Sequence, residues 1–353
     1  MYSREITYGQ AIREAFDQVM ENDPKTVLFG LDVDDPKAIV GTTKGLVEKY
    51  GHDRVFGTPL SEDALTGSAI GMALSGLRPI LNHIRADFML LGMNQLVNMA
   101  AKMHYMFGGQ FRVPMVIRGM IGKSWGQGAQ HSQSLLSLFA HIPGLVVVAP
   151  TTPFDAKGCM VSACLFDGPV VYIDHRMLHY QVGEVGEDFY GCTIGHGRVT
   201  RKGTDITIVG ISFMQVECLR AAEHLEKLGI KVQVVDPIWL RPLDISLILD
   251  SVDYTDGKVL IVDNDWVECG IGSEIAVSIV EFGEKGPYKI KRMGFAPTPC
   301  PPSPTLEDEF YPNEKTIALS ALRLLRADTE SNVSKLVGFP NEDKNEQVFK
   351  GPF

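Results

Sequence analysis

Apolar residues along this chain occur in short continuous runs, separated by longer stretches with helical periodicity. In the first half the runs lie at residues 27–34, 78–84, 113–119, 145–150 and 170–175. Helical patterns between them include residues 64–76 and 91–108. Continuous apolar strands that alternate with helices are typical of a parallel sheet covered by helices on both faces. The first half therefore predicts an α/β domain.

The same alternation begins again after a polar, Gly-rich segment at residues 183–205. The predicted strands are 206–212, 231–237, 258–264 and 288–295, and the predicted helices are 215–229 and 272–286. We therefore expect two α/β domains, at residues 1–190 and 191–330, each with a mostly parallel sheet covered by helices. Residues 331–353 are polar with weak periodicity and predict a tail, either loose or draped on a partner.

Composition fits two soluble globular domains, since the 353 residues are 45% hydrophobic and 22% charged. A net charge of −10 without a basic run argues against a nucleic-acid surface. Neither a membrane-spanning run of about 18 apolar residues nor the apolar core of a signal peptide is found, so we expect no membrane association. Six cysteines without C-x-x-C spacing indicate free thiols in a reducing compartment. The expected location is the cytoplasm, or an organelle if a presequence has been removed.

The stretch TPLSEDALTG predicts a helix that starts at Ser61 and carries Glu62 and Asp63 in its first turn. One interpretation is that both acids lie on the surface and interact favourably with the helix dipole. However, the following residues are apolar or small on every face, which predicts a buried helix. A buried carboxylate needs a partner or a raised pKa, so a functional role for Glu62 is the alternative.

Two further candidates follow predicted strands. His131 lies where a Gly-rich loop leads into a helix, and loops at the carboxyl edge of a parallel sheet commonly carry catalytic groups. Phe88 lies just beyond the strand at 78–84. For His131 the alternatives are a catalytic group or a histidine that only hydrogen-bonds its loop. For Phe88 they are a residue that fills the core or an aromatic face offered to a planar heterocycle.

Four stretches in this order carry a family resemblance. They are RVFGTPLSEDALTGSAIGMALSGLRPI, RADFMLLGMNQLVNMAAKMHYMFGG, GAQHSQSLLSLFAHIPGLVVVAP and VVDPIWLRPLD. The chain resembles, over about residues 4–326, the β subunit of the thiamine-diphosphate-dependent decarboxylating component of 2-oxo acid dehydrogenase complexes. The resemblance implies a pyrimidine-binding domain followed by a transketolase C-terminal domain.

The resemblance also implies roles for individual residues. Glu62 matches the Glu of the family's TP-x-x-E motif, which binds a ring nitrogen of the cofactor's aminopyrimidine and promotes loss of the thiazolium proton. Leu60 and Phe88 match cofactor contacts, with Phe88 packed on the pyrimidine. His131 matches the active-site histidine that helps in substrate binding or in acyl transfer to lipoamide.

The GDG motif that anchors the diphosphate through a metal in this family does not occur in the chain. We therefore expect no metal site here, and expect Mg²⁺ and the diphosphate to be held by an α subunit in an α2β2 heterotetramer. A lipoyl acyltransferase core is a further expected partner. Phe166 and Gly168 replace side chains of a family potassium site, so no potassium is expected.

Arg85 departs from the family pattern, which has an uncharged residue there. It is a candidate either for a salt bridge, with Asp63, Asp87 or the α chain, or for a contact with an anionic group on the substrate. Two other functions stay open at this point. One is a split transketolase-type enzyme that transfers a two-carbon ketol group, and the other is a non-catalytic scaffolding subunit.

Overall fold

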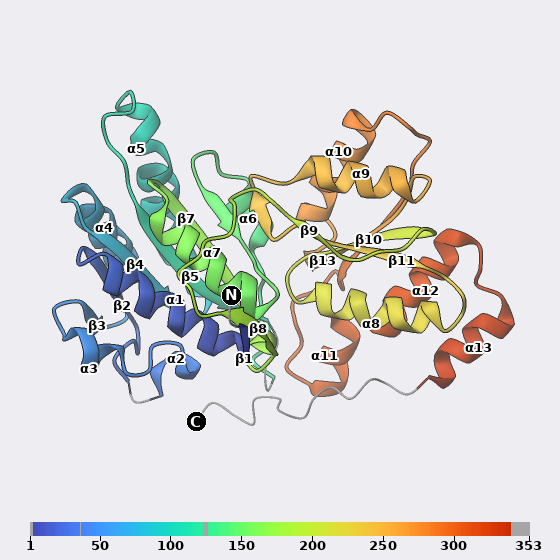
Figure 1. Cartoon of the computed structure of the whole chain (residues 1–353), viewed down its shortest axis with the longest axis horizontal. Coiled ribbons are helices and arrows are strands. Elements are labelled where there is room, and N and C mark those ends of the chain that lie inside the picture. Colours follow the sequence, from blue (N-terminus) through green and yellow to red (C-terminus); the bar gives the residue numbers. More distant parts are fainter. Residues whose placement is uncertain (1–2, 36, 123–125, 340–353) are drawn as a thin grey trace. The chain divides into compact units, whose positions relative to one another are not determined.

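The computed structural model describes residues 3–35, 37–122 and 126–339. Chain contacts divide these into two compact units (Figure 1). The first unit contains the described residues up to 122 together with 130–194, and the second contains 126–129 together with 195–339. The main division falls between Ile194 and Gly195, and the sequence analysis placed it near residue 190.

The first unit is built on a parallel sheet. Its strands are β1 (Ser3–Thr7), β2 (Thr26–Gly30), β3 (Val55–Gly57), β4 (Arg78–His83), β5 (Met115–Ile121), β6 (Val146–Val148), β7 (Pro169–His175) and β8 (Val182–Gly186). The main sheet has the order β6-β7-β5-β4-β2-β3, and each neighbouring pair is parallel. Strands β1 and β8 form a separate antiparallel pair. Every residue of β2, β5 and β7 is buried, which explains their continuous apolar runs.

Helices connect and cover these strands. They are α1 (Tyr8–Asn22), α2 (Ala38–Gly41), α3 (Leu46–Tyr50), α4 (Glu62–Leu74), the 3-10 helix η1 (Ala86–Gly92), the π-helix η2 (Asn94–Ala100), α5 (Ala101–Met106), α6 (Leu136–Ala140), α7 (Pro153–Leu165) and the 3-10 helix η3 (Arg176–Leu178). The single helix predicted at residues 91–108 is therefore wrong in detail, because the segment passes from η1 through η2 into α5. Gly92, at the first junction, packs so tightly on α4 that an added Cβ would lie 2.5 Å from Thr66 Oγ1.

Helix α1 shows how local sequence starts and orients an element. Thr7 and Gln10 form a reciprocal capping box at its start, with hydrogen bonds of 3.2 and 2.8 Å. Its apolar residues recur at helical spacing and are buried. They place α1 against α7, beside which it lies in Figure 1.

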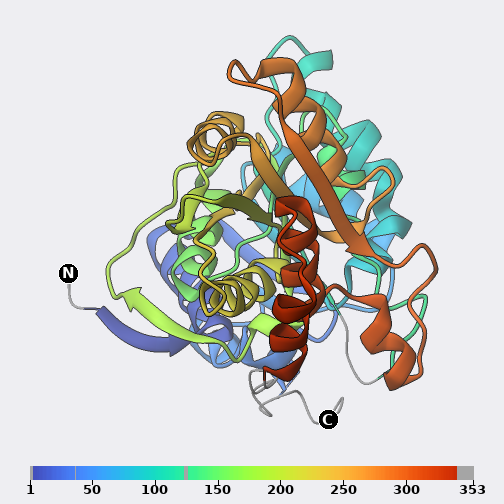
Figure 2. The ribbon, with the colours of Figure 1, turned by 90° about the vertical axis from the view of Figure 1, so that its right-hand side faces the viewer.

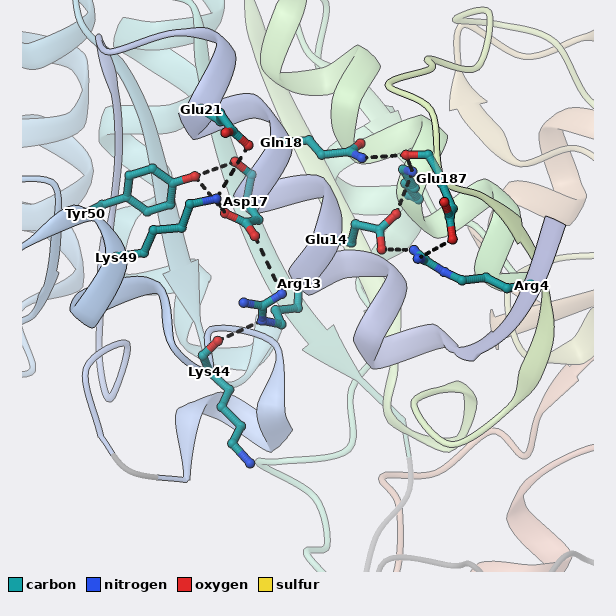
Figure 3. Close-up of polar contacts among 11 residues, drawn as sticks. Arg4, Arg13, Glu14, Asp17, Gln18, Glu21, Lys44, Lys49, Tyr50 and Glu187 are labelled. Carbon is teal, nitrogen blue, oxygen red and sulfur yellow. Dashed lines mark hydrogen bonds and ion pairs between the residues drawn. The ribbon is translucent and has the colours of Figure 1, made fainter. Parts of the chain in front are cut away.

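The polar face of α1 is tied to neighbouring segments (Figure 3). Asp17 accepts hydrogen bonds of 2.6 Å from both Lys49 Nζ and Tyr50 Oη in α3. Glu14 accepts a 2.7 Å bond from Lys157 of α7 and pairs with Arg4 of β1. These contacts fix the helix on its outer side as the apolar residues do on its inner side.

A buried ion pair lies in the middle of this unit. Arg118 on β5 donates two 2.9 Å hydrogen bonds to Asp174 on β7, and both side chains are 0% exposed. Burial opposes ionisation of Asp174, but the charge of Arg118 and a hydrogen bond from His179 outweigh it and hold the pKa of Asp174 at about 2. Arg118 also donates to Asn82 on β4, so one guanidinium links three adjacent strands.

The second unit has its own sheet and helices. Its strands are β9 (Arg198–Arg201), β10 (Ile206–Gly210), β11 (Val232–Asp236), β12 (Trp239–Arg241), β13 (Lys258–Trp266) and β14 (Lys289–Phe295). Its helices are α8 (Met214–Glu226), α9 (Ile245–Tyr254), α10 (Ile271–Phe282), α11 (Pro304–Phe310), α12 (Glu314–Leu325) and α13 (Glu330–Gly338). The sheet order is β14-β13-β10-β11-β9, parallel except for the antiparallel edge strand β9.

The predicted tail at 331–353 is wrong for residues 331–339. These residues belong largely to α13, where Leu336 is 2% exposed in the same core as α8 and α12, which lie side by side (Figure 2). Phe339 stacks on His224 of α8, with ring centroids 5.4 Å apart. Two apolar anchors in a polar segment are too few to produce a periodic signal, yet they suffice to dock one short helix. Residues 340–353 lie outside the described residues.

All six cysteines are free, and Cys269 is the exposed one. Each helix within the described residues is too short or too polar to cross a bilayer.

Candidate active site

Three adjacent strands of the first unit end at the same edge of the sheet. β4 ends at His83, β5 ends at Ile121 and β7 ends at His175, and Ile121 pairs with His175 in register. The segments that follow β4 and β7 carry Arg85, Phe88 and Arg176. The carboxyl edge of a parallel sheet is where such folds bind ligands. This edge of the sheet is therefore the expected position of a ligand site.

Phe88 and His131 lie together, although 43 positions separate them in the sequence. Their ring centroids are 5.2 Å apart, with the planes at 77°. Phe88 lies in η1 and is 37% exposed, so a face of the ring is available to another planar group. The interpretation of Phe88 as a core residue is thus wrong, because a core aromatic would be fully covered.

An acid next to Phe88 holds the loop that carries His131. Asp87 accepts two 3.1 Å hydrogen bonds from Gln133, one from the backbone N–H and one from the side-chain amide. Burial raises the pKa of Asp87, while the bonds from Gln133 and the charge of Arg85 lower it in part. The segment Asp87–Phe88 and the loop at His131, which are distant in the sequence, are thereby fixed to each other by two hydrogen bonds.

Glu62 is the first residue of α4, with Ser61 at the N-cap, as predicted. Its carboxylate makes no hydrogen bond to another residue in the described part of the chain, while its backbone oxygen accepts a 2.7 Å bond from Thr66. That oxygen lies 3.1 Å from the position a Cβ on Gly92 would take, so the first turn of α4 packs directly on η1, the helix of Phe88. Leu60, just before the helix, is 69% exposed.

The predicted burial of this helix on every face is wrong for the chain by itself. Thr66, Ala69, Ile70 and Ala73 are buried, and the opposite face, formed by Ala64, Ser68, Gly71 and Leu74, is exposed. Composition that is small or apolar all round does not reveal which face a given chain covers. Glu62 itself is only partly buried.

Arg85 is almost completely buried, with 3% of its surface exposed. Its Nη1 donates a 3.2 Å hydrogen bond to the carbonyl oxygen of Gly122, the residue that follows β5. Its charge also acts on the neighbouring Asp87, in line with one of the expected ion-pair partners. Asp63, another expected partner, is exposed.

Sequence reasoning missed Asp87 as the group that positions the His131 loop, and missed Arg176 altogether. Arg176 follows the last residue of β7 and is 5% exposed. A signal was present, because a charged residue directly after an apolar strand falls on the edge where ligands bind. The Asp87–Gln133 contact had no such signal, since it joins two loops that are distant in the sequence.

These groups fit one half of a thiamine diphosphate site. Phe88 offers an aromatic face, and within the described residues neither the Glu62 carboxylate nor the His131 imidazole is committed to a hydrogen bond. Both can therefore bind an external heterocycle or substrate. The described residues contain no group of three or more His, Cys, Asp or Glu side chains arranged to hold a metal ion.

Each of the two units matches a known protein family. The family "Transketolase, pyrimidine binding domain" matches residues 4–181, and "Transketolase, C-terminal domain" matches residues 195–317. A solved structure described as "Split gene transketolase, inactive beta4 tetramer" superimposes with a TM-score of 0.76 at 23% identity, covering 92% of this chain and 100% of that chain. The fold is thus that of the transketolase class of thiamine-diphosphate-dependent enzymes.

Sequence relatives narrow the class. The β subunit of acetoin:2,6-dichlorophenolindophenol oxidoreductase from Cupriavidus necator is 40% identical, over 92% of this chain and 98% of its own. The mitochondrial pyruvate dehydrogenase E1 component subunit beta-2 from Oryza sativa is 35% identical, over 91% of this chain and 86% of its own. This chain belongs to the family of β subunits of thiamine-diphosphate-dependent 2-oxo acid dehydrogenase components.

Proposed function

We propose that this chain supplies the pyrimidine-side half of an active site that decarboxylates a 2-oxo acid and passes the acyl group to lipoamide. The observation that carries the proposal is the assembly of Glu62, Phe88 and His131 around one edge of the first unit. η1 connects them, since it bears Phe88 and packs on the first turn of α4, and Asp87 fixes the His131 loop to it. Thiamine diphosphate, when bound, supplies the electron sink that lets a 2-oxo acid lose carbon dioxide.

Glu62 is proposed to hold a proton at a ring nitrogen of the aminopyrimidine. It lies in the first turn of α4, and within the described residues its carboxylate makes no hydrogen bond to another residue, so it is available to an external ring nitrogen. A carboxyl within hydrogen-bond reach of that nitrogen can act as a general acid–base group.

Phe88 and His131 are proposed to act on either side of the reacting group. The exposed face of Phe88 packs against the pyrimidine and fixes its plane. The His131 ring meets Phe88 edge-on, so its nitrogens can reach a substrate bound beside the aromatic plane. His131 would there hold the substrate carboxylate or move a proton during acyl transfer. Leu60, exposed before α4, would complete the apolar wall.

An α subunit is proposed to cover this edge and to hold Mg²⁺ and the diphosphate, giving an α2β2 heterotetramer. Two observations support it. The chain lacks a GDG motif, and α4 exposes a face of small and apolar residues at helical spacing next to Glu62. A lipoyl acyltransferase core is proposed as the acceptor. A scaffolding role is disfavoured because Glu62, Phe88 and His131 are all present in a connected arrangement.

The test is Glu62→Gln in the co-purified αβ complex, with Asp63→Asn as the matched control. Gln keeps the shape of Glu62 but cannot share a proton, so turnover of the preferred 2-oxo acid should fall about 10²–10⁴-fold. Asp63 is the exposed neighbouring acid and its variant should keep near-normal turnover. Both variants should assemble with the α chain. A Glu62→Gln complex that turns over at the normal rate would refute the assignment.

A further inference from the structure

The candidate active site combines an anchored helix with an irregular loop. The anchored helix is η1, which carries Phe88 and packs on both β5 and α4. An added Cβ on Gly119 of β5 would lie 3.1 Å from the Cα of Ala86 and 2.5 Å from Met89 Sδ, so η1 lies directly on the sheet. Gly92 makes an equally close contact with α4. Packing on both sides therefore fixes the backbone of η1.

The loop that carries His131 contains no helix or strand between residues 130 and 135. Ser132 is 2% exposed, yet its Oγ has no hydrogen-bond partner within the described residues, so this side chain does not tie the loop down. Leu135 has a φ of 60°, in the left-handed region that is unfavourable for a residue with a Cβ. A loop held in such a conformation needs contacts elsewhere that keep it there.

Asp87 of η1 provides contacts of this kind. Gln133 donates two hydrogen bonds of 3.1 Å to Asp87 Oδ1, from its backbone N–H and from its side-chain amide. Asp87 Oδ2 is buried and has no hydrogen-bond partner in the described part of the chain. Hydrogen bonds to a carboxylate are strong and directional, so these two fix the backbone of Gln133 relative to η1. Two residues earlier, His131 meets Phe88, the next residue of η1, through the ring contact.

We propose that Asp87 and Gln133 are positioning residues for His131, which act by holding its imidazole beside the aromatic ring of η1. This inference rests on the function proposed above and assigns separate supports to the two halves of the site. The pyrimidine-binding groups Glu62 and Phe88 are held by the packing of α4 and η1. The imidazole depends on the hydrogen-bonded pair. Loss of the pair should therefore impair the step that His131 performs and leave cofactor binding intact.

Hydrogen exchange of the Gln133 amide, read by mass spectrometry with residue-level fragmentation, tests the contact itself in the co-purified αβ complex. In the wild type this N–H is bonded to Asp87, so its exchange should be slow. Asp87→Ala removes the acceptor and should speed the exchange at least about tenfold. Asp87→Asn keeps an amide oxygen and should speed it less. Asp167→Asn is the matched control, because Asp167 also accepts two side-chain hydrogen bonds but precedes β7 at the opposite edge of the sheet.

Turnover and cofactor affinity separate positioning from general damage. Asp87→Ala should lower kcat for the preferred 2-oxo acid about 10- to 100-fold, since a displacement of about 1 Å can lower a rate by such a factor. Gln133→Ala keeps the backbone bond and should lose less, and Asp87→Asn should retain part of the lost activity. Calorimetry should give an unchanged affinity for thiamine diphosphate in all three variants. If Asp87→Ala does not assemble with the α chain, Asp87→Asn and Gln133→Ala carry the same comparison.

A double-mutant cycle with His131→Ala decides whether the pair acts through the imidazole. Once His131 is absent, adding Asp87→Ala should lower kcat by no more than about twofold. Losses that multiply, a fall in cofactor affinity that parallels the fall in kcat, or an unchanged exchange of the Gln133 amide in Asp87→Ala would overturn the inference. The exchange measurement needs no turnover, so it decides the contact even if the proposed 2-oxo acid activity is not found.

Discussion

Arg118→Met should cause a large loss of stability in the first unit. The substitution leaves Asp174 as a carboxylate with 0% exposure that has lost two hydrogen bonds of 2.9 Å, and it leaves Asn82 and Thr42 without the donor they share. Removing one partner of a buried ion pair costs about 3–5 kcal/mol. For a unit of this size, where about 1 kcal/mol corresponds to a shift of 2–4 °C, the melting temperature should fall by roughly 6–20 °C.

The stability lost in Arg118→Met should also depend on pH. In the wild type the pKa of Asp174 is held at about 2, below its usual value. The contribution of the Asp174 carboxylate to the free energy of unfolding is therefore complete above about pH 4 and is lost as the pH falls through 2. Without Arg118, burial should raise this pKa, and the penalty at pH 7 should shrink as the carboxyl takes up a proton. The difference between variant and wild type should therefore narrow from pH 7 to pH 5.

Calorimetric melting of the purified chain measures both effects, with Arg112→Met as the control. Arg112 makes an exposed pair with Asp167, which is worth less than about 1 kcal/mol. The double substitution Arg118→Met and Asp174→Leu should recover part of the loss, because no uncompensated charge is then buried. An Arg118→Met loss as small as that of Arg112→Met, or no recovery in the double variant, would refute the reasoning.

Two further outcomes are expected in the second unit. Leu336→Ala should lower the free energy of unfolding by about 2–5 kcal/mol, because Leu336 is 2% exposed. Val337→Ala is the control and should change it by less than about 0.5 kcal/mol, because Val337 is 69% exposed. Equal effects of the two substitutions in thermal unfolding would mean that α13 is not docked. Burial raises the pKa of Asp263 to about 7, against the bond from Gly272, so wild-type stability should decline as pH rises from about 4 to 7. Asp263→Asn should remove up to about 4 kcal/mol of that decline, and parallel pH profiles of variant and wild type would contradict it.

The fold was predictable because its signals are local and repeated. Continuous apolar runs identified the central strands, and β4 and β7 lie within one residue of the predicted ranges at each end. Segments anchored by few contacts were not predictable in this way. Leu336 and Phe339 dock α13 through a single buried side chain and one stacked ring, and such isolated anchors resemble ordinary residues of a polar tail.

The site was predictable residue by residue only where a motif or a strand end marked it. Glu62, Phe88 and His131 were named from the sequence, and the structure brings the last two into ring contact. Asp87 acts through hydrogen bonds to a distant loop that no spacing rule encodes. Strands β4 and β7 each pair with β5, from opposite sides, and this strand order places Arg176 on the same edge of the sheet as Arg85. The sequence around Arg176 does not reveal that position.

Helix α4 connects the fold to the chemistry. One stripe of its residues, at positions 66, 69, 70 and 73, packs inside the first unit, and the opposite stripe, at 64, 68, 71 and 74, is exposed. The exposed stripe is almost free of charge, so covering it with a second chain would exclude water without leaving a buried ion unpaired. Such a cover would close over Glu62 as well, because Glu62 is the first residue of the same helix. The carboxyl would then meet a bound heterocycle in a site from which water is excluded, where a group within hydrogen-bond reach of a ring nitrogen can act as a general acid–base catalyst.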